Sequence, residues 1–366
     1  MLTEALLLFG VGLALLIAGA ELLVRGASRL ASGLGVAPLV VGLTVVAWGT
    51  SAPELAVNIQ STVEGVPGVA LGNVLGSNIF NVLFVLGLSA VVAPLVVARQ
   101  IVRRDVPLMI AVSLLFLLLA LDGEIERLDG TILLSGLALY TGWSIWMARR
   151  ESAPATDDAR RANPQSRRSH GSAPFNVLLI LAGLGVLAFG SRWLVEGSVA
   201  VAVALGVGKL VVGLTIVAAG TSLPEAATSI VAGLRGERDI AVGNIIGSNI
   251  FNILGVLGVT AVIARPSISV PDAALRFDVP VMIAVAVACL PIAVTGHRIA
   301  RWEGALFLAY YLAFLAYVVL DATQHDALPG YLTFMRLFAI PITVVTLLVV
   351  SVRAYKEGRR TRIESS

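Results

Sequence analysis

Long apolar stretches separated by short polar connections dominate the chain. Apolar runs of about 18 residues or more indicate membrane-spanning helices, whereas a membrane barrel would show segments of about ten residues with alternating polarity. The runs here are continuous, so we predict an all-α polytopic membrane protein with eleven spans. The predicted spans are residues 4–24, 37–62, 69–95, 106–121, 130–148, 175–195, 208–233, 240–264, 278–295, 303–320 and 331–352.

Composition supports this prediction and excludes several classes of protein. Charged residues make up 13% of the 366 residues and hydrophobic residues 57%, with a mean hydropathy of +0.92, whereas soluble domains carry about 25% charged residues. The single cysteine, Cys289, excludes a disulfide framework and a multi-thiolate metal cluster. The three histidines lie in polar connections, which argues against a zinc enzyme, and we expect no prosthetic group.

The basic residues are distributed unequally between the two sets of connections. Most of the 26 lysines and arginines lie on the inner side if the N-terminus is outside, so we predict an N-out, C-in protein of a prokaryotic plasma (inner) membrane. The basic tail, residues 353–366, is expected to meet anionic lipid headgroups, and nucleic acid is not an expected partner. The segment Ala18-Gly19-Ala20 resembles a signal-peptidase site, but no positive charge precedes it, and we predict a retained helix. The oligomeric state is left open.

An internal repeat organises the chain. Residues 42–90 align with residues 213–261, and more than half of the aligned positions are identical. We therefore predict a first repeat over 1–148 and a second over 175–321, each with five spans. The remaining segments are a flexible cytoplasmic linker or regulatory surface (149–174), an extra span (331–352) and the basic tail (353–366).

The number of spans in each repeat has a mechanical consequence. Five is odd, so the second repeat enters the membrane from the opposite side and the two copies are inverted. Inverted repeats give a transporter two near-equivalent packings and hence alternating access to one central site. A channel does not need this symmetry.

Two glutamates lie near the middle of the second and seventh spans, in the blocks GTSAPE and GTSLPE. A carboxylate at a helix centre costs about 2.5–3.5 kcal/mol on insertion scales. Glu54 and Glu225 could each be protonated and hydrogen-bonded across helices, but their duplication favours a functional site. Together they carry two negative charges, which one Ca²⁺ or two Na⁺ would neutralise.

Oxygen donors surround these glutamates in the sequence. Pro53 and Pro224 should bend their helices and release carbonyl groups near Gly49 and Gly220. Hydroxyl groups occupy the positions two and three residues before each proline, and two Asn-Ser-Asn stripes follow at helical spacing in the next spans. The stripes could serve interhelical hydrogen bonding or ion coordination. The stripes are Asn73, Ser77 and Asn81, and Asn244, Ser248 and Asn252.

The blocks GTSAPE with GNVLGSNIFN, and GTSLPE with GNIIGSNIFN, resemble the two α-repeats of the cation/Ca²⁺ exchanger superfamily, in its prokaryotic Na⁺/Ca²⁺ exchanger branch. The resemblance covers residues 1 to about 321. It implies a secondary antiporter, not an enzyme, with Ca²⁺ and Na⁺ as its substrates. The Ca²⁺ ligands it implies are Thr50, Glu54, Thr221 and Glu225. The Na⁺ ligands it implies are Ser51, Ser77, Ser222, Ser248 and the backbone oxygens of Ala47 and Ala218, with Asn81 and Asn252 completing the centre.

This sequence departs from the family pattern in two ways. Some members have aspartate where this chain has Asn252, so the centre here has one carboxylate fewer, and the extra span exceeds the usual ten. A Ca²⁺/H⁺ antiporter is the nearest alternative, although its Gly-Asn-Ala-x-Glu repeats are absent. A cation channel is a further alternative. An intramembrane hydrolase would need a nucleophile with a histidine, or a catalytic aspartate pair in adjacent spans, and no histidine lies in a predicted span.

Overall fold

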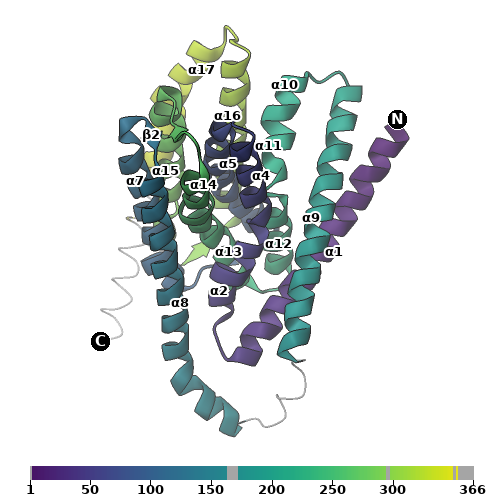
Figure 1. Ribbon diagram of the computed structural model, residues 1–366, viewed down its shortest axis with the longest axis vertical. Coiled ribbons are helices and arrows are strands. Elements are labelled where there is room, and N and C mark those ends of the chain that lie inside the picture. Colours follow the sequence, from purple (N-terminus) through teal and green to yellow (C-terminus); the bar gives the residue numbers. More distant parts are fainter. Residues whose placement is uncertain (1, 163–171, 294–296, 349–351, 353–366) are drawn as a thin grey trace.

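The computed structural model describes residues 2–162, 172–293, 297–348 and 352, and it is almost wholly helical (Figure 1). Eight of the described helical segments are long and apolar enough to cross a membrane, and a ninth consists of two helices bent by 53°. Each of the eleven predicted spans falls largely on a helical segment.

The first half begins with eleven helical or strand elements in sequence. They are α1 (Leu2–Leu34), α2 (Pro38–Val41), η1 (Gly42–Val46), α3 (Ala47–Thr50), α4 (Ala52–Val63), α5 (Pro67–Phe80), η2 (Asn81–Leu86), α6 (Gly87–Val92), β1 (Leu95–Val96), η3 (Ile101–Asp105) and α7 (Val106–Leu119). They are followed by η4 (Ala120–Asp122), β2 (Glu124–Ile125) and α8 (Arg127–Ala162).

The second half repeats this order. It contains α9 (Ala173–Ala204), α10 (Lys209–Val212), η6 (Gly213–Val217), α11 (Ala218–Gly220), α12 (Leu223–Leu234), α13 (Arg238–Phe251), η7 (Asn252–Leu257), α14 (Gly258–Ile263), β3 (Ile268–Ser269), η8 (Ala274–Asp278), α15 (Val279–Val287), η9 (Leu290–Ala293), β4 (Arg298–Ile299) and α16 (Arg301–Ala322). The appended segment, residues 328–348, begins with α17 (Leu328–Phe334) and η10 (Met335–Ala339).

Two short antiparallel ladders show how the halves interlock. Strand β1 pairs with β4, and β2 pairs with β3, so each half donates one strand to each ladder. Equivalent strands thus exchange partners across a pseudo-two-fold axis. This reciprocity is the arrangement expected of inverted repeats.

Helices α1 and α9 cross closely on one side of the bundle (Figure 1). Glycines at seven-residue intervals line the crossing on both helices, at Gly12, Gly19 and Gly26 and at Gly183, Gly190 and Gly197. A Cβ atom at Gly12 would lie 2.4 Å from the backbone nitrogen of Leu194, and one at Gly183 would lie 2.6 Å from that of Leu23. Small residues allow this backbone approach, which lets two helices pack in lipid without a hydrophobic driving force.

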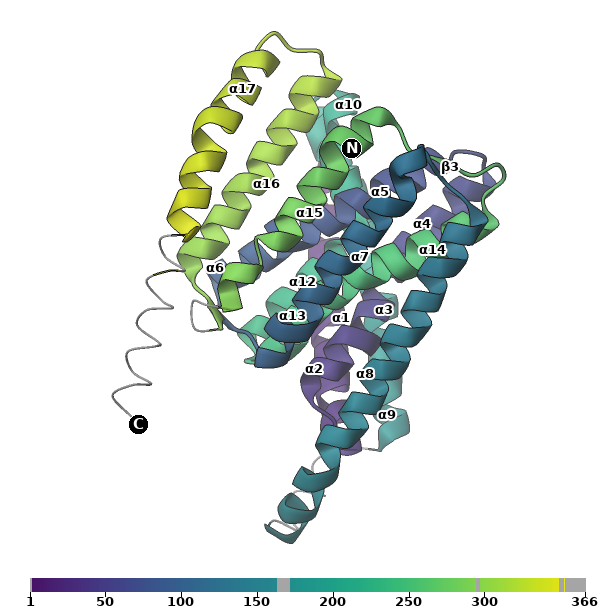
Figure 2. The same cartoon turned by 90° about the vertical axis from the view of Figure 1, so that its left-hand side faces the viewer.

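The centre of the molecule is formed by the α5 and α13 segments, and α13 is buried along almost its whole length. Helices α16 and α17 lie on the outside, side by side (Figure 2). The described residues of the appended segment include none that is buried. Tyr310 on α16 ties this segment to the bundle by donating to Thr343 Oγ1 at 2.7 Å.

The predicted linker differs from the structure in its first part. Helix α8 continues to Ala162, fourteen residues into the segment where we expected a flexible connection. Extending an existing helix requires no new nucleation step, so each added residue costs little. Residues 163–171 of the predicted linker, and the predicted tail over 353–366, lie outside the described residues.

Candidate cation site between the two repeats

The second helical segment of each repeat breaks at the serine that precedes the proline. Ser51 has φ −83° and ψ 6°, and Ser222 has φ −93° and ψ 9°, both outside regular helical geometry. A π-helical stretch precedes each break by one short helix, and π-helical turns are frequent at functional sites. After each break a new helix begins with proline in its first turn, where its missing N–H is tolerated.

The breaks place Glu54 and Glu225 in the first turns of α4 and α12, and both side chains are fully buried. Ser51 Oγ donates to Glu225 Oε1 at 3.0 Å, and Ser222 Oγ donates to Glu54 Oε1 at 2.7 Å. Each carboxylate is therefore held by the serine of the opposite repeat. The two acidic groups that the repeat predicts lie in one site.

The threonines of the two blocks bond across the repeats as well. Thr50 Oγ1 donates to Asn244 Oδ1 at 3.0 Å, and Thr221 Oγ1 donates to Asn73 Oδ1 at 3.2 Å. Each hydroxyl uses its hydrogen in this bond and retains oxygen lone pairs. These asparagines thus orient the threonines, an interhelical role that the sequence left open.

The serines of the stripes complete the inner wall. Ser77 Oγ lies 3.0 Å from Ser222 Oγ, and Ser248 Oγ donates to Glu225 Oε1 at 3.5 Å. Both serines are buried. The structure therefore brings the predicted serines against the glutamates.

Two asparagines that the sequence analysis overlooked position the predicted ones. Asn81 Nδ2 donates to Asn249 Oδ1 at 3.1 Å, and Asn252 Nδ2 donates to Asn78 Oδ1 at 3.2 Å. The signal was available, because Asn78 and Asn249 are identical members of the repeated GSNIFN block. Asn58 is a third overlooked residue, since its Oδ1 accepts from Asn73 at 2.7 Å.

Among the glutamates and asparagines of this site, all of which lie in the described part of the chain, four buried oxygen atoms have no hydrogen-bond partner. They belong symmetrically to both repeats: Glu54 Oε2, Glu225 Oε2, Asn81 Oδ1 and Asn252 Oδ1. A buried acceptor without a partner is costly, and an uncompensated carboxylate more so. A cation coordinated by these atoms would satisfy all four, and oxygen donors suit hard cations such as Ca²⁺ and Na⁺.

The backbone carbonyls near the breaks are partly occupied. The oxygen of Ala47 accepts from the Ser51 N–H at 3.1 Å, whereas the Ser222 N–H bonds to Ala219 and not to Ala218. The carbonyl of Gly220, one of those that proline was expected to release, accepts from Ser191 Oγ at 2.6 Å. The roles of Ala47 and Ala218 as ligands stay predictions.

Several known proteins resemble this chain in sequence or in structure. The profile of the family described as "Sodium/calcium exchanger protein" matches residues 4–146 and 175–320. A putative antiporter, CaxA, from Alkalimonas amylolytica is 40% identical, covering 84% of this chain and 95% of that protein. The sodium/calcium exchanger MaX1 of Methanosarcina acetivorans is 32% identical, covering 86% and 98%. A solved structure of a sodium/calcium exchanger from Methanococcus jannaschii matches with a TM-score of 0.73 and 29% identity, covering 86% of this chain and 99% of that one.

Proposed function

Because this chain belongs to the sodium/calcium exchanger family, we propose that it exchanges Ca²⁺ for Na⁺ across the membrane through one cation site shared by its two repeats. Ca²⁺ and Na⁺ are transported substrates in this proposal. The membrane is a prokaryotic plasma membrane, with the N-terminus outside and the C-terminus inside. Access to the site alternates between the two faces.

The observation that carries the proposal is the set of four buried oxygens without hydrogen-bond partners. Two belong to carboxylates and two to neutral amides, so a site built from them carries two negative charges. One Ca²⁺ or two Na⁺ would balance that charge. The Nδ2 group of each asparagine bonds to Asn249 or Asn78, which leaves the amide oxygen available to a cation.

The geometry and the family pattern support an assignment of the ligands. Ca²⁺ is bound by the two carboxylates and the two threonine hydroxyls. The hydroxyl hydrogens stay bonded to the asparagines, so the hydroxyl oxygens have lone pairs available for the ion. Na⁺ uses the neighbouring hydroxyl and carbonyl oxygens, which carry no charge, and the two amide oxygens complete the centre. The proposed Ca²⁺ ligands are Thr50, Glu54, Thr221 and Glu225; the proposed Na⁺ ligands are Ala47, Ser51, Ser77, Ala218, Ser222 and Ser248, with Asn81 and Asn252 between them.

The same charges explain coupling. An empty site leaves two carboxylates uncompensated in a low-dielectric interior, and their repulsion raises the free energy of any conformation that closes around them. A loaded site has no such penalty. The carrier therefore changes its access state when it holds Ca²⁺ or Na⁺, which enforces exchange and prevents leak.

The test is ⁴⁵Ca²⁺ uptake into proteoliposomes under an imposed Na⁺ gradient, repeated with H⁺ and with K⁺ gradients. The proposal predicts uptake that follows the Na⁺ gradient and stops when that gradient is dissipated. Uptake driven by the H⁺ gradient alone would replace Na⁺ by H⁺ as the coupling ion. Ca²⁺ flux that needs no counter-cation on the far side would indicate a channel and contradict exchange.

A further inference from the structure

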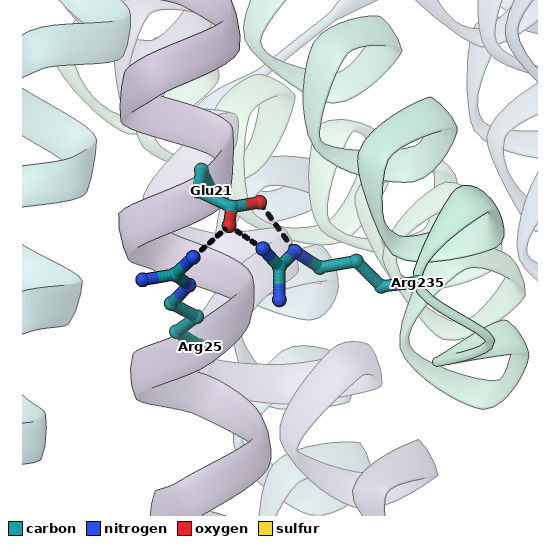
Figure 3. A network of polar contacts seen from close by, with 3 residues as sticks. All are labelled: Glu21, Arg25 and Arg235. Atoms are coloured by element: carbon teal, nitrogen blue, oxygen red, sulfur yellow. Dashed lines mark hydrogen bonds and ion pairs between the residues drawn. The ribbon is translucent and has the colours of Figure 1, made fainter.

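A charged cluster ties α1 to the end of α12 (Figure 3). The carboxylate of Glu21 lies between two guanidinium groups, those of Arg25 on the same helix, at 2.6 Å, and of Arg235 at the end of α12. Ser28, one turn beyond Arg25, donates to Glu237 Oε1 at 2.5 Å. These bonds hold α1 against the second repeat on this side.

The inverted repeat contains an equivalent set of charges in the other half of each helix pair, with every sign reversed. Arg192 on α9 corresponds to Glu21, because each lies two residues after an aligned glycine of the helix crossing. Glu196 corresponds to Arg25, and Glu64, which follows α4, corresponds to Arg235, which follows α12. Both of these last residues precede a glycine with positive φ, +81° and +80°.

The second set is only half assembled. Arg192 pairs with Glu196 at 2.8 Å, as Glu21 does with Arg25, but Glu64 Oε1 instead accepts from Gln60 at 2.9 Å. Helix α1 packs along α12, whereas α9 makes no comparable contact with α4 in the described part of the chain. The Arg192 side chain is accordingly 74% exposed, against 26% for Glu21.

From this asymmetry we infer that Arg192 and Glu64 form an ion pair in the opposite access state, and that the Glu21–Arg235 pair opens when they do. The two states of an inverted repeat exchange the environments of equivalent residues. Helices α1 and α9 meet at glycines that leave no space for a Cβ, so they move together, and closing one pair separates the other. Each end state has one bridge, and an intermediate position has neither.

This ion-pair exchange sets the balance between the two access states, so the four residues position the transport machinery and do not bind the transported ion. The inference rests on the alternating access of the proposed function but not on the identity of the coupling ion. Any antiporter with this fold would use it. Its test therefore reads conformation directly, in membranes that contain both Na⁺ and Ca²⁺ so that the carrier can change its access state, and it measures no flux.

The first experiment is cross-linking in membranes, in a Cys289→Ala background that removes the one native thiol. We expect a cross-link in each of two double variants. One combines Glu64→Cys with Arg192→Cys, and the other combines Glu21→Cys with Arg235→Cys. Both are read as a mobility shift or a linked peptide by mass spectrometry. Failure of the Glu64–Arg192 pair to link, while the Glu21–Arg235 pair links in equally folded protein, would overturn the inference. If Ca²⁺ uptake did not depend on Na⁺, the proposed function would be wrong and the cross-linking result would still stand.

The second experiment transplants the charges. Glu64→Arg alone faces Arg192 with a like charge, and we expect uptake to fall at least about tenfold, since like charges brought together cost several kcal/mol. Combining it with Arg192→Glu and Glu196→Arg reproduces the Glu21, Arg25 and Arg235 set, and should restore uptake to within about twofold of the parent. The matched control is Arg276→Glu, which should leave uptake unchanged. Arg276 pairs with Asp272 at 3.2 Å on an exposed face. If the triple variant transports no better than the single Glu64→Arg variant, the inference is wrong. Recovery is expected only if residues 64 and 192 interact, and not if Arg192 interacts with Glu196 alone.

Discussion

Replacing Glu54 by glutamine tests the charge at the centre of the site. Glutamine has the same shape and keeps an oxygen that can accept the Ser222 hydrogen bond, so it removes the charge and changes little else. The remaining carboxylate then binds a divalent ion without its counterpart. Breaking a buried charge arrangement in this way costs about 3–5 kcal/mol, which corresponds to Ca²⁺ binding weaker by about a hundredfold to a few thousandfold.

The assay is Na⁺-driven ⁴⁵Ca²⁺ uptake by proteoliposomes over a range of Ca²⁺ concentrations, compared with the parent protein. Glu126→Gln is the matched control, because Glu126 is exposed in a connection and should leave uptake unchanged. Size-exclusion chromatography and thermal unfolding establish that the Glu54→Gln protein is folded. A half-saturating Ca²⁺ concentration equal to that of the parent would refute the role assigned to Glu54.

Three further substitutions test other parts of the account. Ser222→Ala removes a hydrogen bond to a carboxylate, a bond to a charged group worth about 1.5–3 kcal/mol, so the Na⁺ concentration that half-saturates uptake should rise at least about tenfold; an unchanged value contradicts the assignment. Gly12→Ala places a Cβ 2.4 Å from the Leu194 nitrogen and should destabilise the protein by about 1–3 kcal/mol, which lowers its unfolding temperature. Gly10→Ala, whose Cβ would have nothing within 4 Å, should leave the unfolding temperature unchanged. Equal shifts in the two variants would show that the α1–α9 contact is looser than described. Tyr310→Phe loses the bonds to Thr343 and Ala339 and should make the appended segment more accessible to protease without slowing uptake, so a loss of transport would assign that segment a functional role.

The sequence predicts most of the fold because lipid imposes strong rules on it. Apolar runs mark the spans, and the repeat implies that the halves are related by inversion, which the reciprocal β1–β4 and β2–β3 ladders display. The extension of α8 to Ala162 is not predicted by the sequence, because the polar composition of this segment is equally typical of a flexible linker. A helix that leaves the membrane continues as long as its backbone bonds are satisfied, and composition alone gives no end point.

The site was predicted less completely than the fold. Duplication singled out the glutamates and hydroxyls, but it could not show that Ser51 bonds Glu225 and Ser222 bonds Glu54, because these bonds depend on how the helices face each other. The supporting amides of Asn78 and Asn249 were overlooked for the same reason. Their role emerges only when the two repeats are packed together, since each orients an asparagine of the other half.

Equilibrium binding of ⁴⁵Ca²⁺ to the purified protein tests whether a single Ca²⁺ lies between Glu54 and Glu225. We expect one Ca²⁺ bound per chain, displaced by Na⁺, and no Ca²⁺ bound at the same concentration by either Glu54→Gln or Glu225→Gln. If the two carboxylates belonged to separate sites, the parent would bind two ions and each variant would still bind one, and that result would contradict the account.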